Sequence, residues 1–149
     1  MRESREWCVA IHYERGGGPD HTRLVYRAQK IVVGYDGSES AKRALDRAAG
    51  LTGYGSLLTV VTVASSPSEL EKSSHLLAEA TDRLLVQRVF ARPLERVGNV
   101  ADELIATVRE LDADLLILGN GKNALQRLLL GSVSSTLVHR APCDVLVTR

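Results

Sequence analysis

Hydrophobic residues beyond residue 30 follow two alternating patterns, short continuous apolar runs and longer stretches with apolar positions three or four apart. Continuous runs are typical of strands buried on both faces of a parallel sheet, and the longer spacing is typical of amphipathic helices. The runs predict five strands, at residues 31–33, 57–63, 88–97, 115–118 and 143–148. Pro93 lies inside the third run, which favours an edge position because proline has no N–H to donate.

Helices are predicted between these strands. The first helix follows Ser38, a good N-cap residue, and the second spans about residues 69–85. The third follows Asn99 as its N-cap, and the last begins near Ser132. Strands that alternate with helices indicate an α/β domain with a parallel sheet and helices on both faces. Ligands of such sheets bind beyond the carboxyl ends of strands where the winding reverses, which selects the loops at residues 34–38 and 119–132.

Residues 1–29 differ from the rest of the chain. They contain the only tryptophan, Trp7, and a Gly-Gly-Gly-Pro run that ends at Pro19, between two short β-like stretches. One interpretation is a hairpin added to the domain. The alternative is a poorly ordered extension, or sequence upstream of the true start. The predicted domain is therefore residues 30–149.

Composition narrows the function classes. The 149 residues carry 19 basic and 18 acidic side chains, and this balance argues against a general nucleic-acid binder. No apolar run approaches the ~20 residues that a membrane helix needs. Cys8 and Cys143 form neither a disulfide framework nor a metal motif, so a reducing, cytoplasmic location is the expectation.

The loop after the fourth strand has the chemistry of an anion site. Gly119, Gly121 and Gly131 permit close backbone approach, and Ser132 and Ser134 begin a helix whose first N–H groups lack partners. The segment from residue 119 onward has an excess of positive charge. It contains four basic residues against the single acid Asp144: Lys122, Arg127, Arg140 and Arg149. The alternative is a plain loop with a serine N-cap and a solvated basic face.

Asp36, at the end of the first strand, has two interpretations. It can bind a ligand hydroxyl or help to hold a metal on a polyphosphate, or it can form an Asx-type turn that caps the helix. A competing motif lies in the fourth loop, where Gly119-Asn120-Gly121-Lys122-Asn123-Ala124 matches the dinucleotide pattern GxGxxA. That motif normally follows the first strand of a longer fold, whereas only one predicted strand remains here.

Residues 30–149 resemble the universal stress protein family. The stretch KIVVGYDGSESAKRAL is similar to its first strand, turn and helix, and LQRLLLGSVSSTLVHRAPCDVLVTR is similar to its C-terminal signature. The resemblance implies a three-layer α/β sandwich of the adenine-nucleotide alpha-hydrolase-like type, with a five-stranded parallel sheet in the order 3-2-1-4-5. It also implies a homodimer formed through the last strand, residues 145–148 (Val145 to Thr148).

The resemblance also implies a nucleotide site for ATP or AMP. The ATP-binding branch carries Gly-x2-Gly-x9-Gly-Ser/Thr, and Gly121, Gly131 and Ser132 fit the second half of that pattern. Only one residue separates Gly119 from Gly121, where the family pattern has two. Carried over by position, the implied site consists of groups at the adenine, the ribose and the phosphates: Gly34, Tyr35 and Val63 at the adenine, Asp36 near the ribose and phosphates, and Gly119, Gly121, Lys122, Gly131, Ser132, Val133 and Ser134 at the phosphate end.

The function expected from the residues and the resemblance is a regulatory adenine-nucleotide-binding module of the stress response. No nucleophile or general base is positioned by the sequence, so at most slow ATP hydrolysis is expected, with Asp36 the candidate for contact with a nucleotide-bound Mg²⁺. Two alternatives remain. One is a family member that acts only through protein contacts, which the shortened glycine spacing favours, and the other is a dinucleotide-dependent enzyme.

Overall fold

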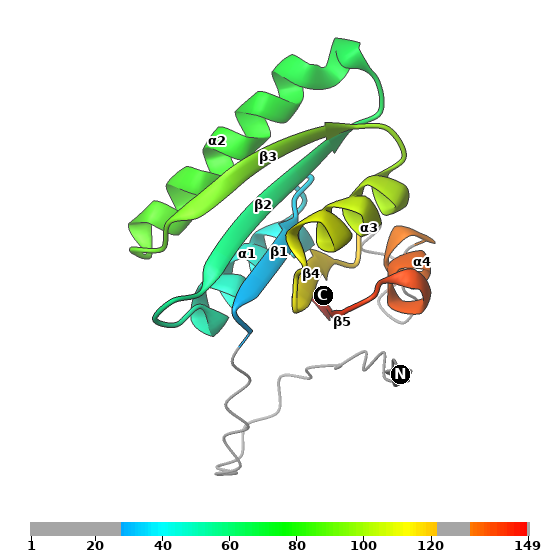
Figure 1. Cartoon of the computed structure of the whole chain (residues 1–149). Helices are drawn as coiled ribbons and strands as arrows, with labels where there is room; N and C mark the ends of the chain where they lie inside the picture. Colours follow the sequence, from blue (N-terminus) through cyan, green and yellow to red (C-terminus); the bar gives the residue numbers. More distant parts are fainter. Residues whose placement is uncertain (1–27, 122–131, 149) are drawn as a thin grey trace, which may run out of the picture.

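The computed structural model describes residues 28–121 and 132–148. Their sheet has five parallel strands in the order β3-β2-β1-β4-β5, as the resemblance implies (Figure 1). The strands are β1 (Lys30–Gly34), β2 (Leu57–Ala64), β3 (Ala91–Val97), β4 (Leu115–Gly119) and β5 (Asp144–Thr148). The helices are α1 (Glu39–Leu51), α2 (Leu70–Val86), α3 (Val100–Leu111) and α4 (Ser132–Arg140), with a 3₁₀ turn at Pro67–Glu69 before α2. The predicted hairpin or extension falls mostly on residues 1–27, outside the described residues.

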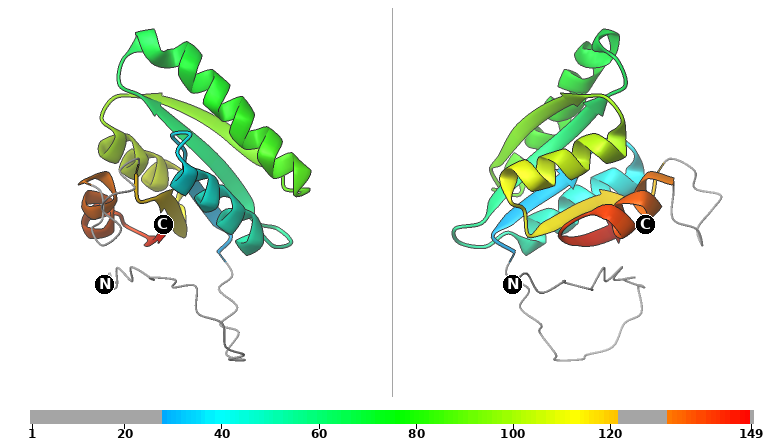
Figure 2. Two further views of the ribbon diagram at one scale, coloured as in Figure 1. Left: turned by 180° about the vertical axis from the view of Figure 1, so that it is seen from behind. Right: turned by 45° about the vertical axis from the view of Figure 1, so that its right-hand side comes forward.

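The helices form two layers, one on each face of the sheet. Figure 2 shows α1 and α2 against one face, and α3 and α4 against the other. Residues alternate between the faces along β2, so Leu58 and Val60 pack in the α1/α2 core while Val61 packs in the α3/α4 core. Both cores are aliphatic, and burial of these side chains is the dominant stabilising contribution to the fold.

The predicted helix caps are confirmed. The Ser38 side chain accepts a hydrogen bond from the Ala41 N–H at 3.2 Å, and the Asn99 side chain accepts one from the Asp102 N–H at 3.1 Å. Each satisfies a backbone donor that the first helical turn leaves without an intrahelical partner. Both caps lie at the carboxyl edge of the sheet, so they fix where two loops of the site turn into helices.

The predicted third strand starts too early. The prediction began at residue 88, but β3 begins at Ala91 because the C-terminus of α2 occupies the preceding positions. Arg88 has a left-handed φ of 59°, and the N–H groups of Arg88 and Val89 donate to the carbonyls of Leu85 and Leu84. This is the Schellman arrangement, which closes a helix by satisfying its last carbonyls. The edge position expected from Pro93 is confirmed, because β3 is the outer strand beside β2.

The entry of the chain into the sheet includes two residues before the predicted domain start. Ala28 is buried in the α1/α2 core, and the backbone N–H groups of Gln29 and Lys30 donate to an Asp114 carboxylate oxygen at 2.9 and 2.8 Å. The Gln29 carbonyl accepts from the Leu57 N–H at 2.7 Å. These contacts anchor β1 between its two neighbours. In the described part of the chain, no helix has the length and apolarity needed to span a membrane.

Candidate functional site

A cavity of about 710 Å³ opens at the carboxyl edge of the sheet. This edge includes the point between β1 and β4 where the winding reverses, the position at which open α/β sheets bind ligands. The cavity is lined by nine residues predicted for the site: Gly34, Tyr35, Asp36, Val63, Gly119, Gly121, Ser132, Val133 and Ser134. Two further candidates, Lys122 and Gly131, lie outside the described residues. The two loops selected from the sequence therefore meet around one space.

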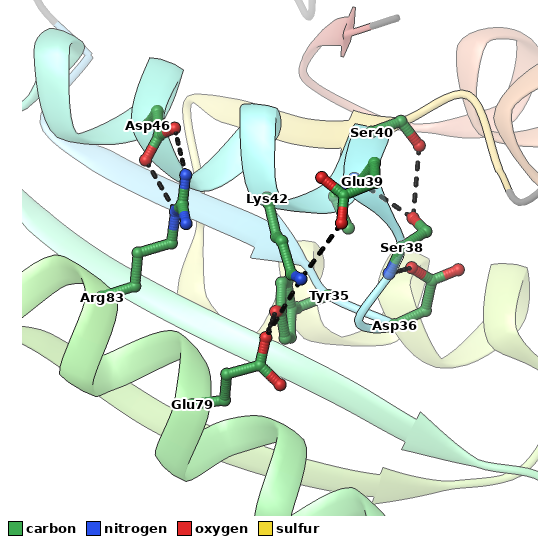
Figure 3. A network of polar contacts seen from close by, with 10 residues as sticks. Tyr35, Asp36, Ser38, Glu39, Ser40, Lys42, Asp46, Glu79 and Arg83 are labelled. Carbon is green, nitrogen blue, oxygen red and sulfur yellow. Dashed lines mark hydrogen bonds and ion pairs between the residues drawn. The ribbon is translucent and has the colours of Figure 1, made fainter.

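The β1–α1 turn forms one wall of the cavity. The Tyr35 N–H donates to the Val61 carbonyl at 2.8 Å. Figure 3 shows the next contact of the turn, in which an Asp36 carboxylate oxygen accepts from the Ser38 N–H at 2.9 Å. This second bond is the Asx turn that was one of the two interpretations of Asp36. The Asp36 side chain is nevertheless exposed and lines the cavity. The Asx turn therefore fixes the Asp36 carboxylate at the cavity wall, where it remains accessible to a ligand.

The backbone conformation of this turn favours glycine at Gly37. Its φ is +80°, a conformation that residues with a Cβ rarely adopt, and a Cβ placed there would lie 2.7 Å from the Leu76 side chain of α2. The turn therefore approaches α2 closely. That approach brings α2 to the cavity wall.

Tyr35 lines the cavity, but its hydroxyl points to α2. The hydroxyl donates to a Glu79 carboxylate oxygen at 2.7 Å, and Glu79 also pairs with Lys42 at 3.7 Å (Figure 3). Burial first, and then the Glu79 carboxylate, raise the pKa of Tyr35 far above its ordinary value. Tyr35 is therefore a neutral donor that joins the β1–α1 turn to α2, and its hydroxyl is not presented to a ligand.

Gly119 has a packing role that its glycine motif did not reveal. A Cβ at this position would lie 2.6 Å from the Ser40 carbonyl carbon and 2.7 Å from the Ala41 nitrogen. The end of β4 thus packs directly against the first turn of α1. This contact is a structural requirement for glycine, independent of any contact with a ribose or phosphate.

Hydrogen bonds connect the glycine loop to α1, α4 and β5. The Ser40 hydroxyl donates to the Gly121 carbonyl and the Ser134 hydroxyl donates to the Gly119 carbonyl, each at 3.2 Å. The Thr148 hydroxyl donates to the Ser40 carbonyl at 2.8 Å. Gly121 has a φ of +99°, and a Cβ there would meet open space. The loop is therefore held from both sides while its backbone at Gly121 faces the cavity.

The N-terminus of α4 completes the described wall. Ser132 is exposed and Val133 is half-buried at this end, where helical N–H groups and the helix dipole favour an anion. Of the four basic residues predicted around this loop, Arg140 is described, and Lys122, Arg127 and Arg149 lie outside the described residues. Arg140 pairs with Asp102 at 3.1 Å and does not line the cavity.

The α2 side of the cavity was missed by the sequence reasoning. Lining residues from this side include Ser65, Glu69, Lys72 and Ser73. The loops after the first and fourth strands were selected, and the resemblance added Val63 at the end of β2, but the segment that follows Val63 was not included. The rule that the loops of parallel strands share one edge would have added this segment. Within residues 28–121 and 132–148, no group of three or more metal-ligating side chains occurs.

Comparisons with known proteins agree with the fold and the loops. The sequence model of the Universal stress protein family matches residues 27–149. A universal stress protein of Mycobacterium tuberculosis is 30% identical over 138 residues, covering 78% of this chain and 93% of that protein. A putative universal stress protein of Staphylococcus aureus is 32% identical over 139 residues, covering 81% of this chain and 84% of that protein.

A solved structure extends the agreement to three dimensions. The crystal structure of a universal stress protein in complex with cAMP matches with a TM-score of 0.70 and 33% sequence identity. The match covers 83% of this chain and 98% of that one. The shared sequence, strand order and structure lead to one conclusion: this chain belongs to the universal stress protein family.

Proposed function

We propose that this protein binds an adenine nucleotide, ATP or AMP, in the cavity at the carboxyl edge of the sheet. The observation that carries the proposal is the meeting of two loops at the switch point, with the Asp36 carboxylate on one wall and the α4 N-terminus on another. A relative with 33% identity and the same fold is described in complex with cAMP, which supports an adenine nucleotide here.

In this proposal each part of the nucleotide has a place. The base lies against the end of β2 at Val63 and beside Gly34 and Tyr35. The ribose lies near Asp36, and the phosphates lie at the N–H groups of the loop and of α4, around Gly121 and Ser132. The free N–H groups and the dipole of a helix N-terminus suit a phosphate, and a carboxylate suits ribose hydroxyls. Gly131 and Lys122 complete the phosphate end in the proposal.

A nucleotide-bound Mg²⁺ is the one metal that the proposal includes. The described lining offers two carboxylates, and that of Glu69 already accepts from the N–H and the hydroxyl of Ser65. Asp36 is exposed at the cavity wall, so its carboxylate is the group that would contact an Mg²⁺ carried by the nucleotide. When bound, the metal would supply positive charge that offsets the charge of the phosphates.

The proposed role is regulatory, in the stress response, and not rapid catalysis. The described lining residues include neither histidine nor cysteine, and the Tyr35 hydroxyl is buried against Glu79. Asp36 alone provides no positioned pair of nucleophile and base. We also propose that the protein is cytoplasmic and forms a homodimer through β5, an edge strand of the described sheet whose outer side is unpaired.

A second candidate function rests on the glycine loop. The spacing between Gly119 and Gly121 is one residue shorter than in the ATP-binding pattern, and the Cβ position of Gly119 is filled by Ser40. A family member that acts only through protein contacts is compatible with both observations. One experiment distinguishes these functions: the purified protein is denatured, and the small molecules that it releases are identified by mass spectrometry. ATP or AMP supports nucleotide binding, NAD or flavin would revive the dinucleotide enzyme, and an empty protein that gives no heat with millimolar ATP or AMP would favour protein contacts alone.

A further inference from the structure

A pair of buried hydroxyl groups forms part of the cavity wall. Thr62, on β2, is 2% exposed, and Ser73, on α2, is 5% exposed. Their hydroxyl oxygens are in direct hydrogen-bond contact, and both residues line the cavity. The two groups come from different elements, so the contact joins the sheet to α2 at the cavity wall.

One of the two hydroxyl hydrogens in this pair has no acceptor among the described residues. Each hydroxyl has one hydrogen, and their mutual bond uses only one of the two. Neither hydroxyl has a second hydrogen-bond partner among the described residues. Buried donors almost always have an acceptor, because losing water without replacing it is unfavourable. The second hydrogen therefore needs an acceptor from whatever occupies the cavity.

Three threonine hydroxyls on the helices find an acceptor within their own helix. The hydroxyls of Thr81, Thr107 and Thr136 each donate to the carbonyl four residues earlier in their own helix, at 2.9, 2.8 and 2.9 Å. Ser73 is also in a helix but is bonded to Thr62 instead. This bond lies at the cavity wall, where a ligand can supply the acceptor that the pair lacks.

The position of the pair selects the base end of the proposed nucleotide. Thr62 directly precedes Val63, which the proposal places at the adenine, and Ser73 lies on α2, away from the α4 N-terminus. Purine bases present unprotonated ring nitrogens, which accept hydrogen bonds. We propose that the Thr62–Ser73 hydroxyl pair donates one hydrogen bond to a ring nitrogen of the bound purine and so determines base specificity. This inference rests on the proposed function, and it adds a side-chain donor at the base end, where the proposal otherwise places Gly34, Tyr35 and Val63.

The test removes the donor from the protein and the acceptor from the ligand. The full chain and its double variant Thr62→Val/Ser73→Ala are titrated with AMP and with 1-deaza-, 3-deaza- and 7-deaza-AMP in a calorimeter. Wild type is expected to bind one of the three analogues on the order of tenfold more weakly than AMP, the effect of one buried hydrogen bond. The double variant is expected to bind that analogue and AMP equally. The single variants then identify which oxygen donates.

The matched control is Thr107→Val. Thr107 is fully buried, but its hydroxyl donates within α3, so this variant is expected to keep the wild-type preference. Thr62→Val preserves side-chain shape and serves as the test if the double variant does not fold. Wild type that binds AMP and all three analogues within twofold overturns the inference alone. Wild type that binds no adenine nucleotide overturns the proposed function and the inference with it.

Discussion

Gly119 at the end of β4 and Ser40 in the first turn of α1 pack backbone against backbone. A Cβ on Gly119 would lie 2.6 Å from the Ser40 carbonyl carbon, a contact distance that Cβ atoms in proteins essentially never show. The obstacle is main chain, so no rotamer change relieves it. The contact holds the glycine loop against the helix that Ser38 caps, and it sets the spacing between two walls of the cavity.

Gly119→Ala is therefore expected to destabilise the protein. Forcing a methyl group into a filled space costs about 1–3 kcal/mol in well-packed proteins, and a backbone obstacle places this variant at the upper end. Urea unfolding followed by circular dichroism measures the change. Gly53→Ala is the matched control, because a Cβ there meets nothing within 4 Å. Equal stability of the two variants would contradict the packing role of Gly119.

Tyr35→Phe is expected to lower stability by about 1 kcal/mol, the usual value of a buried hydrogen bond. Its effect on pH dependence is more specific. Because the pKa of Tyr35 is raised by folding, the folded state keeps this proton at pH values where the unfolded chain has lost it. The stabilisation is complete below pH 10 and decreases as pH rises above that value. Unfolding free energies measured from pH 8 to pH 11.5 should fall less steeply in Tyr35→Phe than in wild type, and parallel curves would contradict the assignment.

The proposed β5 dimer predicts a position-specific effect of proline. The Thr148 carbonyl accepts from the Asn120 N–H, so the backbone of Thr148 faces β4 and that of the adjacent Val147 faces the free edge. Val147→Pro removes an outward N–H and is expected to yield a folded monomer. Sedimentation velocity should give a dimer for wild type and a species near 16.2 kDa for the variant. A wild-type monomer, or a variant that remains a dimer, would rule out this interface.

Much of the fold could be predicted from the sequence because its signals are local. The β-branched run before Gly34 and the capping residues Ser38 and Asn99 act within a few residues, and each was placed correctly. The start of β3 was predicted too early because an arginine gives no sequence signal for the left-handed conformation that Arg88 adopts at the end of α2. This conformation is unfavourable for a residue with a Cβ, and closure of α2 compensates the strain here.

The candidate site was less predictable because its contacts join distant segments. Gly119 was assigned to ligand contact from a motif, but its packing against Ser40 depends on how two elements meet. The contributions of Ser73 and Lys72 depend on the angle at which α2 crosses the end of β2. The direction of the Tyr35 hydroxyl also depends on that crossing, since its acceptor Glu79 lies on α2.

The central claim, a nucleotide in the cavity between the β1–α1 turn and the glycine loop, is tested most directly by calorimetric titration of ATP and AMP into Gly121→Ala. Gly121 and Gly55 both have a positive φ, +99° and +82°, and a Cβ on either meets open space, but only Gly121 lines the cavity. The two alanine variants thus impose similar backbone strain at different places. We predict that wild type and Gly55→Ala bind the nucleotide, and that Gly121→Ala binds at least tenfold more weakly. Equal binding by all three proteins, or no binding by wild type, would contradict the account.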